Sequence, residues 1–175
     1  MAKRERKQAS DFEQKILDVA RVARVVEGGR RFSFRVTVAI GNRNGKVGVG
    51  IAKAANVSSA VEKAVADAKK NAIEFPIVSR TIPHEISSKF GAAKLLLIPA
   101  VEGRGIIAGG TVRTILELVG IKDVSSKTTG SSNKINNARA AVIALEKLKG
   151  SISKVKVEKN KEVKENEAEK QEEEI

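Results

Sequence analysis

The stretch RRFSFRVTVAIGNRNGKVGVG, residues 30–50, carries the strongest structural signal in the chain. Its first half alternates strictly, so an extended strand would place apolar side chains on one face and polar or small ones on the other. The face that we expect to be core consists of Phe32, Phe34, Val36, Val38 and Ile40. A second alternating segment follows Asn44-Gly45. This pattern predicts a hairpin with a type I′ turn, in which both central residues have a positive φ.

The same stretch comes close to a phosphate-binding P-loop, which needs two glycines separated by four residues, then a Lys and a Ser or Thr. Here three residues separate Gly41 from Gly45, and Val47 stands where the hydroxyl is needed. A P-loop lysine leads into a helix, whereas Lys46 leads into a strand. The stretch therefore predicts a turn and not a nucleotide site.

The neighbouring segments complete a small α+β unit. Residues 16–26 are rich in β-branched side chains and predict a strand, which the turn Glu27-Gly28-Gly29 joins to the hairpin. A helix capped by Asn56 or Ser58 follows. Its expected inner stripe is Val57, Val61, Ala64, Ala68 and Ile73. Three strands and a helix form one layer pair, and Pro76 marks the end of that domain.

The second half predicts another α+β domain. We expect strands within residues 77–87, 92–102 and 121–129, and a helix over 111–120 that Gly120 ends. A last helix runs from a cap at Ser132 or Asn133 to Gly150. Its expected buried stripe is Ile135, Ala138, Val142, Leu145 and Leu148. The division is then a disordered basic arm (1–11), two domains (12–75 and 76–150) and a disordered Lys/Glu tail (151–175).

Composition limits the classes of function. The chain has 175 residues, 41% of them hydrophobic, and a formal net charge of +12. Residues 151–175 hold six Lys and eight Glu, so the preceding 150 residues carry 27 basic side chains against 13 acidic ones. Such an excess predicts a polyanionic partner. No Cys occurs, which excludes disulfides and thiolate metal sites. No apolar run approaches the roughly 18 residues of a membrane span, so we expect a cytoplasmic protein.

No set of residues predicts catalysis, a metal site or a cofactor. His84 is the only histidine, and the carboxylates of the second half lie at spacings that suggest no acid–base pair. The glycine cluster GRGIIAGG, residues 103–110, is not G-x-G-x-x-G. It predicts a tight turn or a close contact with another chain. We therefore do not expect an enzyme.

The charge of the first domain is concentrated between residues 21 and 53, where only Glu27 is acidic. The basic residues there are Arg21, Arg24, Arg30, Arg31, Arg35, Arg43, Lys46 and Lys53. A solvated face normally mixes signs, so this excess favours a phosphate-binding surface. RRFSFRV partly resembles the strand with which RNA-recognition motifs stack bases. The arginines on the opposite face favour a core role for both Phe residues, and folded RNA read through its backbone fits the composition better.

Four segments occur in the order and spacing of one known family: GGRRFSF, GNRNGKVGVG, GRGIIAGG and GSSNKINNAR. On these segments the chain resembles bacterial small-subunit ribosomal protein five from about Phe12 to Gly150. The resemblance implies a first half similar to double-stranded-RNA-binding domains and a second α+β domain with a left-handed βαβ crossover. A left-handed crossover breaks the usual rule for such units.

The resemblance also implies partners and sites. It places the chain in the small ribosomal subunit, on ribosomal RNA near the messenger entry channel and the decoding region, beside ribosomal proteins four and eight. The expected RNA-binding residues are Arg21, Arg24, Gly28, Gly29, Arg30, Arg31, Arg43, Lys46 and Lys53. A protein interface associated with decoding accuracy is expected at Gly103, Arg104, Gly105 and Arg113. Two other classes stay open here: a free RNA chaperone or double-stranded-RNA regulator, and a nucleotide-using enzyme.

Overall fold

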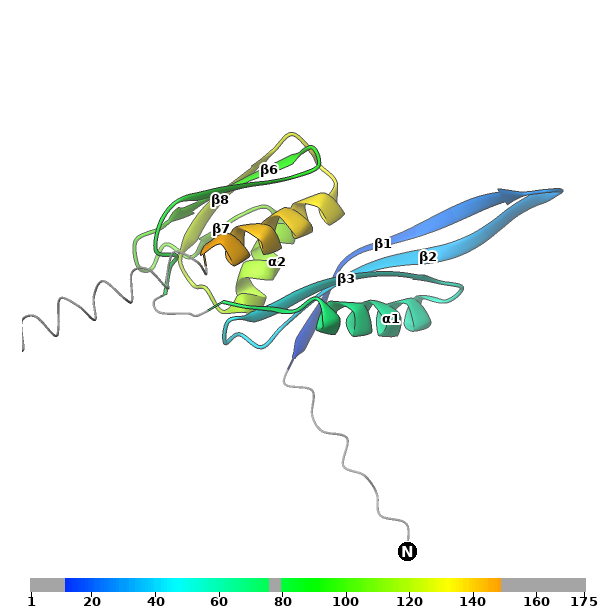
Figure 1. Ribbon diagram of the computed structural model, residues 1–175, viewed down its shortest axis with the longest axis horizontal. Helices are drawn as coiled ribbons and strands as arrows, with labels where there is room; N and C mark the ends of the chain where they lie inside the picture. The colour runs from blue at the N-terminus through cyan, green and yellow to red at the C-terminus, as the bar shows by residue number, and fades with distance from the viewer. Residues whose placement is uncertain (1–11, 76–79, 149–175) are drawn as a thin grey trace, which may run out of the picture.

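The computed structural model describes residues 12–75 and 80–148 (Figure 1). The elements of the first half are β1 (Glu13–Val26), β2 (Gly29–Gly41), β3 (Lys46–Ala54), α1 (Val57–Lys70) and β4 (Ile73–Glu74). The strands form one antiparallel sheet in the order β1-β2-β3-β4. The arm and the tail predicted for residues 1–11 and 151–175 lie outside the described residues.

The second half contains a mixed sheet and two helices. Its elements are β5 (Ile86–Phe90), β6 (Ala93–Pro99), β7 (Ile106–Ile107), α2 (Gly110–Val119), β8 (Val124–Thr129) and a last helix over residues 134–148. The strand order is β5-β6-β8-β7, and β7 runs parallel to β8 with α2 between them. The α+β expectation is confirmed, and the βαβ unit is present. The left-handed sense of its crossover stays a prediction.

Most element predictions agree with the structure, and the exceptions are short or local. The two-residue strands β4 and β7 were not predicted, because so few residues give no periodic signal. Of residues 80–87, the described part of the predicted strand segment 77–87, only Ile86 and Ser87 are strand, since β5 begins at Ile86. Asn133 is the cap of the last helix, where its Oδ1 accepts a hydrogen bond from the Ile135 N–H at 3.0 Å. The imperfect alternation of β1 reflects a register shift between Ile16 and Asp18.

The first sheet is covered on both faces. On one face Val36, Val38 and Ile40 pack against α1, which presents an alanine stripe of Ala60, Ala64 and Ala68. Val57, which we expected in that stripe, is exposed instead. The small alanines let the helix approach closely, and Gly50 of β3 completes the fit. A Cβ added at Gly50 would lie 2.0 Å from the Ala64 carbonyl oxygen.

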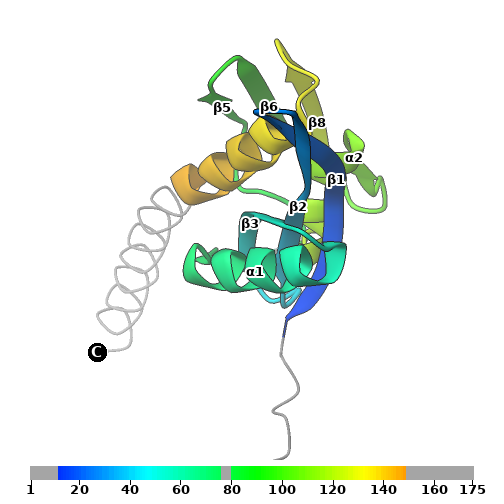
Figure 2. The same cartoon turned by 90° about the vertical axis from the view of Figure 1, so that its right-hand side faces the viewer.

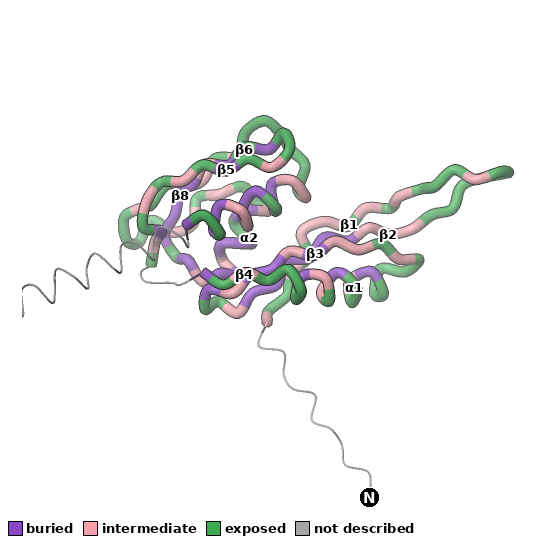
Figure 3. The backbone as a smooth tube through the Cα atoms, in the orientation of Figure 1, coloured by how far each residue is buried: buried purple, intermediate pink, exposed green. Residues whose placement is uncertain are grey.

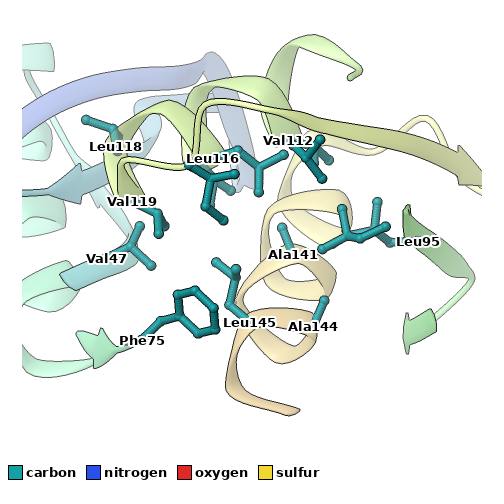
Figure 4. Packing of buried hydrophobic residues seen from close by; sticks show 14 of the residues in the cluster. Val47, Phe75, Leu95, Val112, Leu116, Leu118, Val119, Ala141, Ala144 and Leu145 are labelled. Atoms are coloured by element: carbon teal, nitrogen blue, oxygen red, sulfur yellow. The ribbon is translucent and has the colours of Figure 1, made fainter. Parts of the chain in front are cut away.

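The other face of the first sheet shares a core with the second half. Ala39 and Val47 belong to the same buried cluster as Phe75, the inner residues of α2 and those of the last helix. Figure 4 shows Val47 beside Val119 and Phe75 beside Leu145. The predicted domain boundary at residue 76 therefore divides the sequence, but the buried side chains of the two halves pack into one cluster.

The loop between β2 and β3 is bound to the end of α2, and this corrects the turn prediction. The Arg43 N–H donates to the Leu118 carbonyl and the Gly45 N–H to the Val119 carbonyl, both at 2.9 Å. The residues with a positive φ are Arg43 (55°) and Gly45 (88°), and Asn44 is not one of them. The hairpin is confirmed and its type I′ turn is wrong, because the loop adopts the shape that reaches α2.

The predicted core face of β2 ends before the aromatic residues. Val36, Val38 and Ile40 are buried, but Phe34 is only half-buried and Phe32 is 49% exposed. The prediction that Phe32 belongs to the core is wrong. The strands continue past the end of α1, so this part of β2 has no helix over it (Figures 1 and 2). Alternation identifies a face, but burial also requires an element that covers the face.

Candidate nucleic-acid interface

The β1–β2 hairpin projects from the body of the molecule, and its tip is exposed (Figures 1 and 3). Gly28 has a φ of 77° in the tip. A Cβ added at Gly28 or Gly29 would meet no atom within 4 Å. The backbone of the tip is therefore open to another molecule, and Arg30 and Arg31 follow it directly.

One face of the hairpin and the neighbouring end of β3 gather four cations, which we name the hairpin cation face: Arg24 of β1, Arg31 and Arg35 of β2, and Lys53 of β3. Arg24 lies directly opposite Arg31, and Arg35 lies directly opposite Lys53. Like charges at directly opposed positions destabilise a sheet unless something neutralises them. None of the four forms an ion pair with a carboxylate of the described residues. This face therefore provides the charge that an external polyanion would neutralise.

Closer to the body of the molecule, the same face also carries an acidic side chain. Asp18 of β1 lies there and pairs with Lys134 at the start of the last helix, at 2.9 Å. The Nε of Arg35 is buried and has no hydrogen-bond partner in the structure. The single sign of the face is thus confined to the projecting part of the hairpin.

The opposite face of the hairpin combines arginine with exposed apolar side chains. The Arg21 guanidinium lies over the ring of Phe32, with 3.7 Å between the guanidinium carbon and the ring centroid. Val25 stands directly opposite Arg30 and is 77% exposed. A guanidinium on an aromatic face is attracted by the ring quadrupole, by about 0.5–1 kcal/mol at exposed sites. Arg21 is therefore held against the hairpin, while Arg30 extends from its tip.

Two of the predicted RNA-binding cations lie elsewhere. Arg43 and Lys46 sit at the other end of β2 and β3, where the sheet meets α2. Each faces a carboxylate: Arg43 pairs with Glu13 at 2.7 Å and Lys46 with Glu74 at 3.6 Å. The structure therefore divides the basic residues of positions 21–53 into two groups, of which only the hairpin group lacks such pairing.

The predicted protein interface forms a turn before β7 that a buried carboxylate holds. Asp123 is 1% exposed, and its Oδ1 accepts a hydrogen bond from the Gly105 N–H at 2.8 Å. Arg80 donates to Oδ2 at 3.3 Å. The hydrogen bond from Gly105, more than the nearby Arg80 charge, lowers the pKa of Asp123 although burial opposes the shift. Asp123 thus fixes the backbone that presents Gly103, Arg104 and Gly105.

Arg113, the fourth residue of the predicted interface, already has a carboxylate within its own helix. Its Nε donates to Glu117 at 3.1 Å, and Lys15 of β1 donates to the other oxygen of Glu117 at 2.9 Å. These two cations, with the Lys15 hydrogen bond contributing most, lower the pKa of Glu117. The shared carboxylate connects β1 to α2, so a partner at Arg113 would compete for an existing contact.

The sequence did not single out Asp123 or Glu117 as functional residues. An acidic side chain between Ile121 and Val124 is a weak signal by itself, since a charged residue in an apolar segment is buried only when it is paired. Nothing in the sequence indicates that Arg80, more than 40 residues away, supplies the partner. The contact is visible only in three dimensions.

Within residues 12–75 and 80–148, no three His, Cys, Asp or Glu side chains gather in a way that could hold a metal ion. No helix of this part of the chain is long and apolar enough to cross a bilayer.

Comparison with known proteins identifies the family. The profile "Ribosomal protein S5, N-terminal domain" matches residues 12–76, and "Ribosomal protein S5, C-terminal domain" matches residues 88–158. The chain is 50% identical over 141 residues to small ribosomal subunit protein uS5 of Thermotoga neapolitana, covering 81% of this chain and 79% of the relative. It is 50% identical over 140 residues to uS5c of Cyanophora paradoxa (79% and 83%) and 48% identical over 149 residues to uS5 of Trichormus variabilis (85% and 86%). The chain belongs to the ribosomal protein S5 family.

Proposed function

We propose that this chain, a structural component of the small ribosomal subunit by its family, binds ribosomal RNA through the β1–β2 hairpin near the messenger entry channel and the decoding region. The observation that carries the proposal is the hairpin cation face, where Arg24 lies opposite Arg31 and Arg35 opposite Lys53, and none of the four pairs with a carboxylate of the described residues. Cations at directly opposed positions repel each other and destabilise the sheet, and bound phosphates would neutralise that repulsion.

Several features support RNA backbone as the ligand. The hairpin extends free of the body, so it can enter a space between RNA helices (Figure 1). Its glycine tip permits close approach, and its arginines can bind phosphate oxygens with two donors at once. Phe32 is covered by Arg21, so it is not an open stacking platform for bases. Recognition would then depend on shape and phosphates more than on base edges.

The proposal includes a contribution to translational accuracy at the turn of Gly103–Gly105 and at Arg113. The turn is exposed or half-buried and held rigidly by Asp123, which suits a surface that meets another protein. Ribosomal proteins four and eight are the proposed neighbours, on the family resemblance. If that contact separates when the subunit closes on a correct codon, its strength sets part of the balance between open and closed states.

A sedimentation experiment tests the placement. The tagged chain should remain with the small subunit through a sucrose gradient at high magnesium, and a variant carrying Arg24→Gln and Arg31→Gln should dissociate at lower salt. Arg43→Gln with Lys46→Gln is the matched control, because both of these cations already have carboxylate partners. Recovery of the unmodified chain only at the top of the gradient would instead identify a free RNA-binding protein.

A further inference from the structure

The second sheet has an open face that the expected RNA-binding residues do not include. The helices of the second half lie on one side of this sheet (Figures 1 and 2). The residues that point toward them are buried or half-buried, such as Leu95, Leu97 and Val124. The alternate residues of the same strands point the other way, and no described element packs over them.

This open face carries charge of a single sign, and we name it the outer lysine face: Lys89 of β5, Lys94 of β6 and Lys127 of β8. Lys89 lies directly opposite Lys94, and Lys127 lies directly opposite Leu96 on the neighbouring strand. The strands β5, β6, β7 and β8 contain no acidic residue at all. None of the three lysines forms an ion pair within the described part of the chain.

The surface is also hollowed at this point. A shallow depression of about 370 Å³ is lined by all three lysines, by Lys147 of the last helix, by the hydroxyl residues Ser87, Ser88 and Thr129, and by Leu95 and Leu96. Lysine and hydroxyl side chains are among the groups that bind the phosphate oxygens of nucleic acids. Two lysines at directly opposed positions repel each other in a sheet, and a bound anion would remove that cost.

An ordinary solvated surface does not explain this arrangement. The exposed side of α1 in the same chain mixes both signs, with Glu62 beside Lys63, and Lys69 and Lys70 in the last turn. Mixed signs are the usual composition of a surface without a charged partner. The outer lysine face departs from that composition over three neighbouring strands.

The composition of the face favours RNA over an acidic protein. Protein interfaces are enriched in aromatic residues, Met and Arg, and depleted in Lys. The outward positions of β5, β6 and β8 contain lysines, hydroxyl residues and the aliphatic Leu96 and Ile98, but no Arg and no aromatic side chain. Lysine binds phosphate as a point charge, whereas carboxylates of a protein partner are typically bound by the paired donors of Arg.

We propose that the outer lysine face is a second RNA-backbone surface, separate from the hairpin. It rests on the proposed function, since both surfaces would bind the same ribosomal RNA. The hairpin and this face belong to different sheets of the molecule (Figure 1). One chain would then hold two RNA segments in a fixed relation, and each segment would raise the effective concentration of the other surface.

Binding of the full chain to small-subunit ribosomal RNA at several salt concentrations tests this proposal. The variant carries Lys89→Gln, Lys94→Gln and Lys127→Gln, and the control carries Lys63→Gln, Lys69→Gln and Lys70→Gln, which removes the same charge from α1. Each phosphate contact contributes about 0.7–0.9 to the slope of log affinity against log salt, so the outer-face variant should lower the slope by roughly 2 to 3. The control should leave the slope nearly unchanged.

The outcomes separate this inference from the proposed function. A slope that falls only when Arg24 and Arg31 are replaced, with equal values for the two lysine variants, overturns the outer face and leaves the hairpin as the RNA surface. A slope that no variant changes contradicts both. If the outer-face variant binds RNA normally but joins reconstituted small subunits poorly, the face binds a protein and the RNA inference is wrong. Circular dichroism and urea unfolding verify that each variant is folded.

Discussion

Replacement of Gly120 tests whether the two halves of the chain are held together by the contact between the β2–β3 loop and α2. Gly120 has a φ of 102°, and a Cβ added there would lie 2.1 Å from the Arg43 carbonyl oxygen. Gly120→Ala therefore combines two costs. The left-handed backbone costs an L-residue about 1–2 kcal/mol, and forcing an atom into a packed contact costs about 1–3 kcal/mol more.

Gly103→Ala is the matched control, because it isolates the first of these costs. Gly103 has a φ of 85°, but a Cβ there would meet no atom within 4 Å. We expect urea unfolding to show a loss of roughly 2–5 kcal/mol for Gly120→Ala and only about 1–2 kcal/mol for Gly103→Ala. The difference between the two losses measures how much the packing of Gly120 against the β2–β3 loop contributes to stability.

The unfolding experiment also reports how the halves cooperate. Since Ala39 and Val47 share a core with α2 and the last helix, the unmodified chain should unfold in one transition. Equal losses of stability for Gly120→Ala and Gly103→Ala would refute the reasoning, because backbone strain alone would then account for both. The contact between the β2–β3 loop and α2 would contribute nothing measurable.

Three further predictions concern the core, the buried carboxylate and decoding. Ile40→Ala, at a buried position, should cost about 2–5 kcal/mol in urea unfolding, whereas Phe32→Ala should cost well under 2 kcal/mol because the ring is half exposed; comparable losses would place Phe32 in a core after all. Because the pKa of Asp123 is lowered, its stabilisation should be complete at neutral pH and lost as the pH falls below the ordinary value of about 3.9. The stability difference between the unmodified chain and Asp123→Asn should thus shrink on acidification, and a constant difference would contradict the role of the charge. Gly105→Arg and Arg113→Ser should raise misreading in ribosomes that incorporate them, since a bias of about 1.4 kcal/mol toward closure shifts that equilibrium tenfold, and unchanged misreading would exclude the accuracy proposal.

The two decoding variants should differ in stability. Gly105 has a φ of 74°, so an arginine there strains the backbone even though space is available. Its stability should fall by about 1–2 kcal/mol, whereas Arg113→Ser removes an exposed pair within the helix and should cost only about 0.3–0.5 kcal/mol. Arg113→Ser is therefore the cleaner test of decoding.

Local patterns predicted the parts of the fold that depend on local physics. The alternation from Val36 to Ile40 identified a buried strand face, and the helix cap was predicted at Ser132 or Asn133, of which the structure shows Asn133. Both features follow from the geometry of one element. The same patterns predicted two successive α+β domains, whereas the βαβ unit of the second domain came only from the family resemblance.

The failures share a physical cause, because each depends on a neighbour distant in sequence. Phe32 is exposed because α1 does not extend over that part of β2. The type I′ turn expected at Asn44-Gly45 does not form, because the N–H groups of Arg43 and Gly45 donate hydrogen bonds to the end of α2. The role of Asp123 needs Arg80 and Gly105 around it. For the candidate site, the sequence predicted the basic residues of positions 21–53 but not their division into a hairpin group and a carboxylate-paired group, and it did not indicate the lysines on the second sheet.

The most direct test of the central claim measures how the affinity for small-subunit ribosomal RNA depends on salt when Arg24 and Arg31 are both replaced with Gln. If the hairpin cation face binds phosphates, the slope of log affinity against log salt should fall by about 1.4 to 1.8 for these two contacts. The control variant Arg43→Gln with Lys46→Gln, whose cations face Glu13 and Glu74, should change the slope much less. An unchanged slope in the Arg24 and Arg31 variant, or an equal fall in the control, would contradict RNA binding through the hairpin.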